Sequence, residues 1–508
     1  MRIHLLFAIL LTFGAVATVT RAEPLAVNTI RELTQQNLRP AIELYREFLS
    51  LPNDANYPDD IMRMVAWMED AFDARGFATQ RIQTDGSPLL LAERHLSNDA
   101  RTVLVYLQAD GQPVDRSAWF QDDPYTPVLK ARNESSDWEI IPWQTLAQSF
   151  DPDWRVFARS ASDSKGPMTQ FLMAIALLDE AGFELAYNLK VIIDSEEEMG
   201  SPNLPAAVAA NRDLLAADLL LIFDGPPHPS GRPSVGFGAR GIVTVTLVTY
   251  GPKVPQHSGH YGNFVPNPAF HLAHILSSMK SPDGRVLLPG FYDGVTISDD
   301  IREILAAVPD DEAAILASMG VARPDAVATT LQESIQYPSL NVRGLSSGWV
   351  GKESRTIIPA TATAEIDIRL VKESDPTRLV GLVRSHIESL GYYVIDHEPS
   401  DAERLERPNL VTFTYNFSYA AYRSDMDAAA GLMARAGMRH LYGEKPILIR
   451  TSGGSVPISP FVESLGVPAA KVPTVNIDNN QHSPNENIRL GNFIEGIEIL
   501  MSVLSQTP

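Results

Sequence analysis

The sequence predicts an α/β protein, built on a mostly parallel sheet, with a smaller α+β domain inserted in it. Short apolar, β-branched segments at 102–107, 189–193 and 219–223 alternate with helical patterns, which is typical of parallel sheets. Segments 241–250 and 361–371 instead alternate apolar with polar residues, as half-exposed antiparallel strands do. We therefore expect a main domain over 23–240 and 415–508, interrupted by an insert over 241–414.

Composition sets limits on the function. A chain of 508 residues exceeds one ordinary core, so at least two domains are expected. The net charge of −21 argues against a nucleic-acid partner, because phosphates would be repelled. The chain has no cysteine, which excludes disulfides, thiolate metal sites and a cysteine nucleophile.

The N-terminus has the pattern of a secretory signal peptide. Arg2 precedes an apolar run over 5–19, and small residues around Ala22 suit cleavage there. We expect residues 1–22 to be removed and the mature protein to be exported, periplasmic or secreted, without membrane contact. An uncleaved anchor is the alternative, although the run is shorter than the ~20 residues of a spanning helix.

The elements of the main domain follow in order. Helical spacing predicts helices over 28–50 and 58–76, and the Pro-, Trp- and Asp-rich stretch 111–155 is predicted to be an ordered loop region. Pro167 suits the first turn of a helix over 168–181. A strand is expected within 470–477 and a final amphipathic helix over 490–504, while the insert carries helical patterns at 268–279 and 376–390.

Polar residues stand just beyond several predicted strands. These residues are Asp110, the carboxylates at 196–198, Asp224 and His482. In parallel sheets ligands bind outside the carboxyl ends of the strands, so these side chains are expected to converge. A solvated acidic loop is the alternative for any one of them, but it does not explain the repeated placement.

The converging residue types are those of a metal site. Asp163, Glu198, Asp224 and His482 offer oxygen and imidazole ligands without thiolates, which suits zinc, with manganese or cobalt as alternatives. Two ions sharing a carboxylate would offset the crowded negative charge. Glu197, adjacent to a ligand, is then the candidate general base.

Two competing motifs are weaker. Residues 236–241 match a dinucleotide-binding fingerprint, but a β-type run follows where that motif requires a helix. Ser162 and Lys165 have the spacing of a serine acylase, whose partner motifs are absent from the sequence.

Taken together, the motifs identify a family. The chain resembles the co-catalytic zinc metallopeptidases that include carnosine dipeptidase, bacterial dipeptidases, acetylornithine deacetylase and succinyl-diaminopimelate desuccinylase, and it is most similar to the dipeptidase branch. The matching segments occur in the family's order over nearly the whole chain: 108–115, 161–167, 196–201, 238–241, 257–259, 358–359, 368–371, 453–455 and 482–486.

The resemblance implies a role for each metal-site residue. Asp163 would bridge two divalent ions, with Asp224 completing one site and Glu198 and His482 the other. Glu197 would be the general base. Asp110 would orient the ligand at position 108 from outside the metal site.

The resemblance also gives the insert a role as a lid and dimerisation domain. His257 and Arg369 would contact the substrate and stabilise the developing oxyanion, His257 by reaching across a homodimer. Gly453, Gly454 and Ser455 would bind the substrate carboxylate. From the residues alone, His257 could instead be a turn residue, Arg369 a solvated strand residue, and 453–455 an ordinary glycine turn.

Two positions depart from the family. Gln108 stands where the family has its first histidine ligand, so the site of Gln108, Asp163 and Asp224 is expected to bind its ion weakly. Ser452 stands where carnosine dipeptidases tend to have an acidic residue, which puts specificity for free dipeptides in question.

The expected function is that of an exported metal-dependent hydrolase. It would cleave an amide bond next to a free carboxylate, in a dipeptide or other small peptide, through a water activated by Glu197. An N-acyl amino acid deacylase of the same family is one alternative. A non-catalytic binding protein with a degraded metal site is the other, motivated by Gln108.

Overall fold

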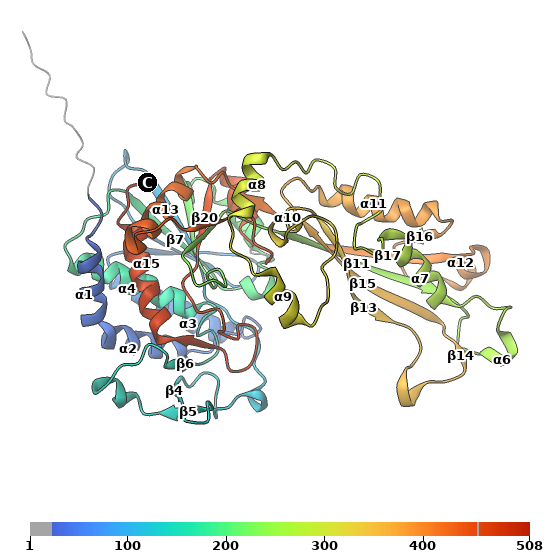
Figure 1. Ribbon diagram of the computed structural model, residues 1–508, viewed down its shortest axis with the longest axis horizontal. Helices are drawn as coiled ribbons and strands as arrows, with labels where there is room; N and C mark the ends of the chain where they lie inside the picture. Colours follow the sequence, from blue (N-terminus) through green and yellow to red (C-terminus); the bar gives the residue numbers. More distant parts are fainter. Residues whose placement is uncertain (1–22, 455–456) are drawn as a thin grey trace, which may run out of the picture.

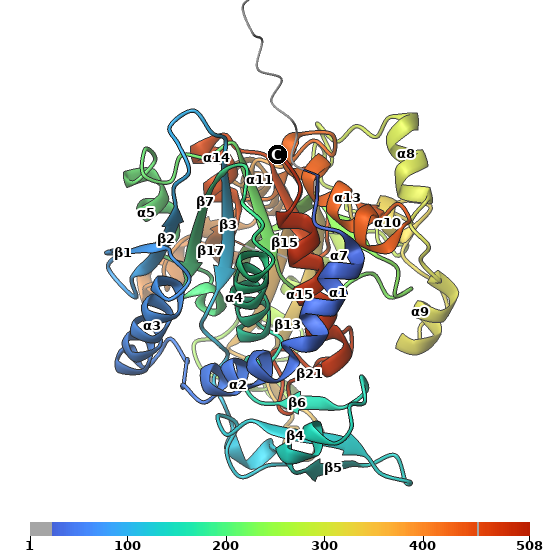
Figure 2. The same cartoon turned by 90° about the vertical axis from the view of Figure 1, so that its left-hand side faces the viewer.

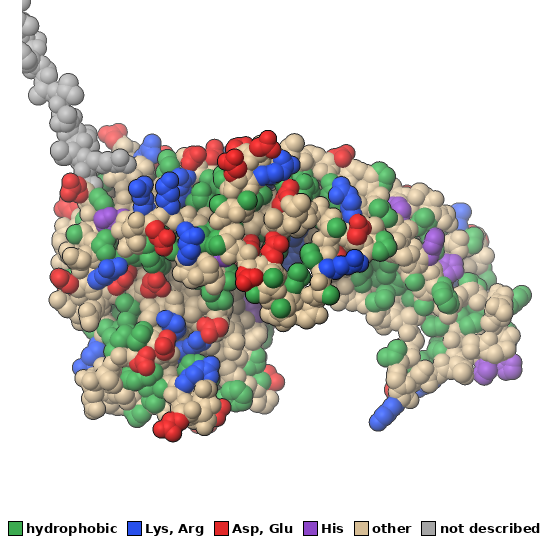
Figure 3. Space-filling model, in the orientation of Figure 1, with side chains coloured by type: hydrophobic (Ala, Val, Ile, Leu, Met, Phe, Trp, Pro, Cys, Tyr) green, Lys and Arg blue, Asp and Glu red, His purple; other side chains and the backbone are tan. Residues whose placement is uncertain are grey.

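The computed structural model describes residues 23–454 and 457–508. The predicted signal peptide at 1–22 lies outside these residues. Within them, no helix is both long enough and apolar enough to cross a bilayer. The chain forms two lobes along its longest axis (Figure 1), and the space-filling view shows a wide hollow between them along the lower edge (Figure 3).

The main domain is built on an eight-stranded sheet whose four central strands, β7, β3, β8 and β20, run parallel. Antiparallel pairing joins β1 to β2, β2 to β7 and β20 to β9. In spatial order the strands are β1 (Ala78–Ile82), β2 (Leu89–Arg94), β7 (Asn188–Asp194), β3 (Thr102–Gln108), β8 (Leu219–Phe223), β20 (Ala469–Val472), β9 (Ser234–Gly236) and β19 (Ile447–Ile449). The predicted α/β class is confirmed, and the three predicted central strands form as expected.

Helices cover both faces of this sheet (Figure 2). Alternate residues of β3 enter two different cores, Val103 and Val105 one and Leu104 and Tyr106 the other. The larger core is closed by α1 (Val27–Gln36), α2 (Leu38–Leu49), α3 (Pro58–Asp73), α4 (Lys165–Glu180), α13 (Ala429–Tyr442) and α15 (Leu490–Leu504). The smaller core is closed by α5 (Leu204–Ala210) and α14 (Ser459–Leu465).

One prediction about the main domain was wrong. The stretch predicted as loop contains strands β4 (Val128–Arg132) and β5 (Trp138–Ile141), and it leads into β6 (Arg155–Phe157). Together with β21 (Asn487–Arg489), these strands form a four-stranded antiparallel sheet. β4 and β5 are short and half-exposed, so their apolar pattern is weak. β6 pairs with a strand more than 300 residues away, which leaves no local signal.

The second lobe has a five-stranded sheet with its own core. Its order is β13 (Ser339–Ser346), β15 (Thr361–Leu370), β11 (Gly241–Tyr250), β17 (Leu410–Tyr419) and β16 (Tyr393–Ile395). Helices α7 (Pro268–Met279) and α11 (Pro376–Ser389) pack on the face formed by alternate buried residues of β11. The domain boundaries stay a prediction, and β17 continues past the boundary expected at residue 414.

Smaller elements complete this lobe. The segment with α8 (Asp299–Ala306), α9 (Glu312–Met319) and α10 (Leu331–Ser334) lies between the lobes (Figure 1). Asp310 of this segment pairs with His228 of the main domain at 2.9 Å. At the far end of the lobe are α6 (Ser258–Tyr261), the strand pair β12 (Gln256–His257) and β14 (Ile357–Ile358), and α12 (Asp401–Glu406). A further short pair, β10 (Gly238–Ala239) with β18 (Tyr422–Arg423), stands where the chain passes between the lobes.

Candidate metal centre

The polar cluster lies at the carboxyl end of the central parallel strands. Gln108 is the last residue of β3 and is in register with Asp194 of β7. Asp224 directly follows β8, and the chain beyond β20 leads to His482. The predicted convergence at this edge is therefore what the structure shows.

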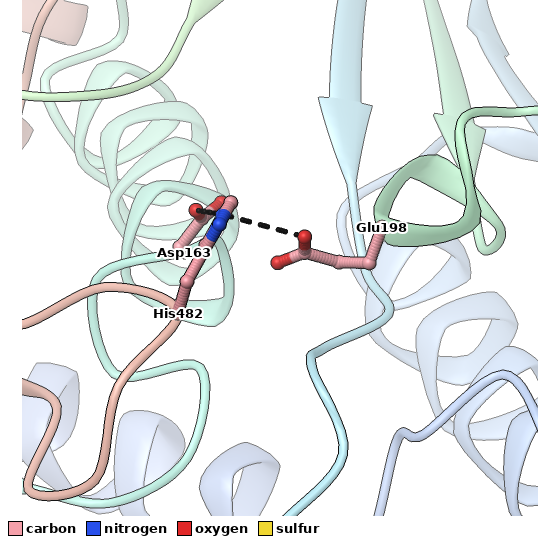
Figure 4. Close-up of side chains that lie close together, drawn as sticks. All are labelled: Asp163, Glu198 and His482. Carbon is pink, nitrogen blue, oxygen red and sulfur yellow. Dashed lines mark hydrogen bonds and ion pairs between the residues drawn. The ribbon is translucent and has the colours of Figure 1, made fainter. Parts of the chain in front are cut away.

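Three of the predicted ligands face one another closely. Suitable donor atoms of Asp163, Glu198 and His482 all lie within 4.8 Å of one another. His482 Nε2 is 3.1 Å from Asp163 Oδ2 and 3.3 Å from Glu198 Oε2 (Figure 4). Ligands about 2.0–2.2 Å from a tetrahedral zinc ion are roughly 3.3–3.6 Å apart, so this group fits a divalent cation.

Asp110 holds the acidic segment in place. Glu197 and Glu198 begin the short 3₁₀ helix Glu197–Met199, which ends at Gly200 in the left-handed conformation (φ 82°). The carboxylate of Asp110 accepts hydrogen bonds from the backbone N–H groups of Glu197 and Glu198, both at 3.0 Å. Asp110 thus fixes this turn, and its role in orienting the ligand at position 108 stays a prediction.

Glu486 holds the loop that carries Asp163. Its buried carboxylate accepts hydrogen bonds from the backbone N–H groups of Ser160, Ser162 and Asp163 at 2.8–2.9 Å. Arg159 pairs with it at 2.9 Å. Sequence reasoning included Glu486 in a motif but gave it no role. Its position four residues after His482 was the available signal.

Burial and crowding of like charges perturb the ionisation of the cluster. Burial, together with Asp163, Glu198, Asp224 and Asp110, raises the pKa of Glu197 well above its ordinary value. Burial and Asp163 raise the pKa of Glu198 to about 7. The hydrogen bond to Asp163 raises the pKa of His482 to about 9. A divalent cation would stabilise the ionised carboxylates and reverse these shifts.

The remaining predicted ligands lie on the other side of Asp163. The Ser164 hydroxyl lies 3.1 Å from Gln108 Oε1, 2.8 Å from Asp163 Oδ1 and 3.4 Å from Asp224 Oδ1. The ammonium of Lys471 lies 3.4 Å from Asp224 Oδ2. Sequence reasoning gave Ser164 and Lys471 no role at the site. Lys471 interrupts an apolar strand, which was the only signal for it.

Of the two insert residues, His257 is not at the cluster in this chain. His257 is exposed in β12, beside α6 at the far end of the second lobe (Figure 1), and its Nδ1 accepts a hydrogen bond from Gly259 N–H. Arg369 lies on β15, with Nε 3.6 Å from Asp367 Oδ2. The catalytic roles of both residues stay predictions.

The glycine segment lies beside the Lys471 side of the cluster. Gly453 and Lys471 line one cavity of about 340 Å³. Ser452 donates a hydrogen bond through its hydroxyl to the carbonyl oxygen of Gly238 at 3.1 Å. Ser455 lies outside the described residues, so its predicted contact with substrate is untested, as are those of Gly453 and Gly454.

A family model decides the classification. Residues 128–506 match the model of peptidase family M20/M25/M40. The chain belongs to this family. The M20 classification confirms the predicted resemblance, and it makes the chain an enzyme of the metallopeptidase class.

Individual M20 relatives are similar to this protein over most of its length. The Cys-Gly metallodipeptidase dug1 of Schizosaccharomyces pombe is 26% identical over 427 residues, covering 82% of both chains. The human Beta-Ala-His dipeptidase is 24% identical over 480 residues, covering 90% of this chain and 88% of that protein. The M20 metallo-carboxypeptidase Sso-CP2 of Sulfolobus solfataricus superposes with a TM-score of 0.76 at 27% identity, over 92% of this chain and 99% of that one.

Proposed function

We propose that this protein is an exported, metal-dependent dipeptidase that cleaves the amide bond next to a free carboxylate. The observation that carries the proposal is the convergence of Asp163, Glu198 and His482 around one position, with Glu197 beside them. The dipeptidase names of two relatives support the choice of substrate. The apolar run within 1–22 and the lack of cysteine support export.

Glu197 has the properties of a general base for this reaction. A bound divalent ion would supply Lewis-acid activation of the scissile carbonyl and of the attacking water. Glu197 takes the proton of that water and returns it to the leaving amine. Asp110 keeps the backbone of Glu197 in position, with Asp110 Oδ1 accepting a hydrogen bond from its N–H group at 3.0 Å.

The substrate carboxylate would be recognised by the chain around Gly453 and Gly454. This segment lies next to the cavity that Lys471 also lines. Backbone N–H groups of a glycine segment can approach a carboxylate closely, because no side chain intervenes. The Ser455 hydroxyl would add a further donor.

We also propose a homodimer through the second lobe. β13 is an edge strand, and it exposes Val342 and Leu345 next to exposed Trp349 and Val350. A second copy covering this apolar edge would bury it. His257 would then be available to the partner's active site, where it would stabilise the oxyanion.

Substrate assays test the activity. Purified mature protein, depleted by a chelator and reloaded with zinc or manganese, should hydrolyse dipeptides and lose this activity again on chelation. Acetyl and succinyl amino acids form the matched panel. Faster cleavage of the acyl amino acids would identify a deacylase instead, and no hydrolysis of either panel would favour a binding protein.

Mixed subunits test the dimer. Glu197→Gln and His257→Ala should each inactivate the homodimer, while an equal mixture of the two should recover roughly a quarter of the activity. Recovery requires that His257 of one subunit serves the site of the other. A fully active monomer in sedimentation would contradict this arrangement.

A further inference from the structure

We propose that the ammonium group of Lys471 takes the place of one of the two metal ions, so that the chain binds one divalent ion, held by Asp163, Glu198 and His482. The inference deepens the proposed function and rests on its metal site. It departs from the two ions expected from the sequence. Three observations carry it: the donor set of the second position, the orientation of Asp163, and the course of the Lys471 side chain.

The second position has a weak donor set. Its protein ligands would be Gln108, Asp163 and Asp224, and the Gln108 amide oxygen is neutral. Zinc sites in proteins use histidine, cysteine and carboxylate ligands. Gln108 is also engaged within the protein, because the Ser164 hydroxyl lies 3.1 Å from its Oε1. These residues therefore fit a zinc ion less well than Asp163, Glu198 and His482 do.

Asp163 presents its two oxygens to different kinds of partner. Oδ2 is on the side of His482, at 3.1 Å from Nε2. Oδ1 is on the other side, 2.8 Å from the Ser164 hydroxyl, and that hydroxyl also approaches Asp224 Oδ1 at 3.4 Å. A hydroxyl has a single proton and donates to one acceptor at a time. On this side Asp163 Oδ1 therefore has one protein donor, the Ser164 hydroxyl, for which Gln108 and Asp224 compete.

Lys471 supplies the positive charge on this side. It comes from β20, which pairs in parallel with β8, the strand that leads to Asp224. Its ammonium lies 3.4 Å from Asp224 Oδ2, and both side chains are largely shielded from solvent, so the pair is screened less than a surface pair.

The chain leaves room for this lysine. A Cβ on Gly225 would stand 2.9 Å from Lys471 Nζ, and one on Gly236 would stand 3.5 Å from Lys471 Cβ. Gly225 is also in the left-handed conformation (φ 72°). A side chain at Gly225 would therefore crowd the Lys471 ammonium, whereas one at Gly236 would make only an ordinary van der Waals contact.

The consequence is a cleft with one exchangeable cation and one fixed cation. A divalent ion coordinated by Asp224 would stand close to the Lys471 ammonium, and the two positive charges would repel each other. The same ammonium offsets the charge of Asp224 at all metal concentrations. Asp224 then serves as the partner of Lys471, and His482 as an essential metal ligand.

Metal content separates these roles. After chelation, reloading with zinc and removal of excess, the wild-type chain should hold about one ion by elemental analysis. Asp224→Asn should still hold about one ion, whereas His482→Ala should hold close to none. Two ions in the wild type, with one lost in Asp224→Asn, would overturn the proposal.

A gain-of-site variant tests Lys471 itself. Gln108→His combined with Lys471→Met should bind about two ions, while Gln108→His alone should stay near one because the ammonium remains. Lys253→Met is the matched control, because Lys253 pairs with Asp401 in the other lobe. A second ion in Gln108→His alone would show that Lys471 excludes nothing. A folded double variant that holds a single ion would contradict the proposal equally.

Manganese offers a readout independent of counting. A chain that holds one Mn²⁺ ion should give the six-line spectrum of an isolated ion in electron paramagnetic resonance. Two ions sharing Asp163 would stand about 3.5–4 Å apart and couple magnetically, which would overturn the proposal. If the wild type holds one uncoupled ion but cleaves no dipeptide, the proposed function fails while this inference stands. If the wild type cleaves dipeptides but holds two coupled ions, the proposed function stands and this inference fails.

Discussion

The two sides of Asp163 use the same sheet edge in different ways. On one side, donor atoms of Asp163, Glu198 and His482 face a common point, and the amide groups of Gln112 and Gln481 donate to Glu198 Oε2 and Asp163 Oδ2. On the other side, Gln108, Ser164, Asp224 and Lys471 are bound to one another. The difference shows that carboxylates converging at strand ends do not by themselves determine how many cations bind. Hydrogen-bond donors contact the carboxylates on both sides, so the feature that distinguishes the second side is the Lys471 ammonium paired with Asp224.

The largest effect is expected at Glu197, which is close to both sides. Glu197→Gln should lower kcat by roughly 10³-fold, because the amide cannot accept the proton of the attacking water. Metal content should stay unchanged, because Glu197 is not a ligand. Steady-state kinetics with elemental analysis of the same samples measures both, and an active variant would remove the proposed base.

Glu486 should matter for stability, because it supports the loop on which both sides depend. Glu486→Gln should cost about 3–5 kcal/mol in the free energy of unfolding, since it leaves Arg159 buried without its charge partner. Glu388→Gln, in an exposed pair with Arg384, should cost less than about 0.5 kcal/mol. Denaturant unfolding of both variants makes the comparison, and equal costs would contradict it.

Asp110 and Gln108 differ in which side they serve. Asp110→Asn should weaken metal affinity by about 10- to 100-fold, because the NH₂ group that replaces one carboxylate oxygen cannot accept the N–H group that this oxygen binds. Gln108→Met should change that affinity by less than about 3-fold, because Gln108 contacts only the other side. Chelator competition gives both values, and the reverse order would place the ion beside Gln108.

Metal affinity at Asp163, Glu198 and His482 should depend on pH. Since the pKa of His482 is raised to about 9 and that of Glu198 to about 7, both groups retain protons near neutrality that an ion must displace. Metal affinity should therefore rise with pH and level off above about 9. Calorimetry in buffers of different ionisation enthalpy should detect proton release at pH 7. An affinity that does not change with pH would contradict the assignment of His482 as a ligand.

The sequence predicted the helices and strands better than it predicted the side-chain contacts at the second metal position, formed by Gln108, Asp163 and Asp224. Strand 219–223 and helix 490–504 formed at the predicted residues, because the strand is an uninterrupted apolar run and the helix has a strong apolar periodicity. The roles of Lys471 and Ser164 could not be predicted, since they depend on β20 lying next to β8 and on rotamers around Asp163. The order of strands in a sheet has no signature in local sequence. The resemblance supplied the ligand set, but not how Gln108 and Lys471 divide it.

Anomalous diffraction at the zinc edge from a crystal grown with zinc tests the central claim most directly. A single peak bonded to Asp163, Glu198 and His482, with Lys471 still paired to Asp224, is the predicted result. A second peak between Asp163 and Asp224, with the lysine displaced, would contradict the account.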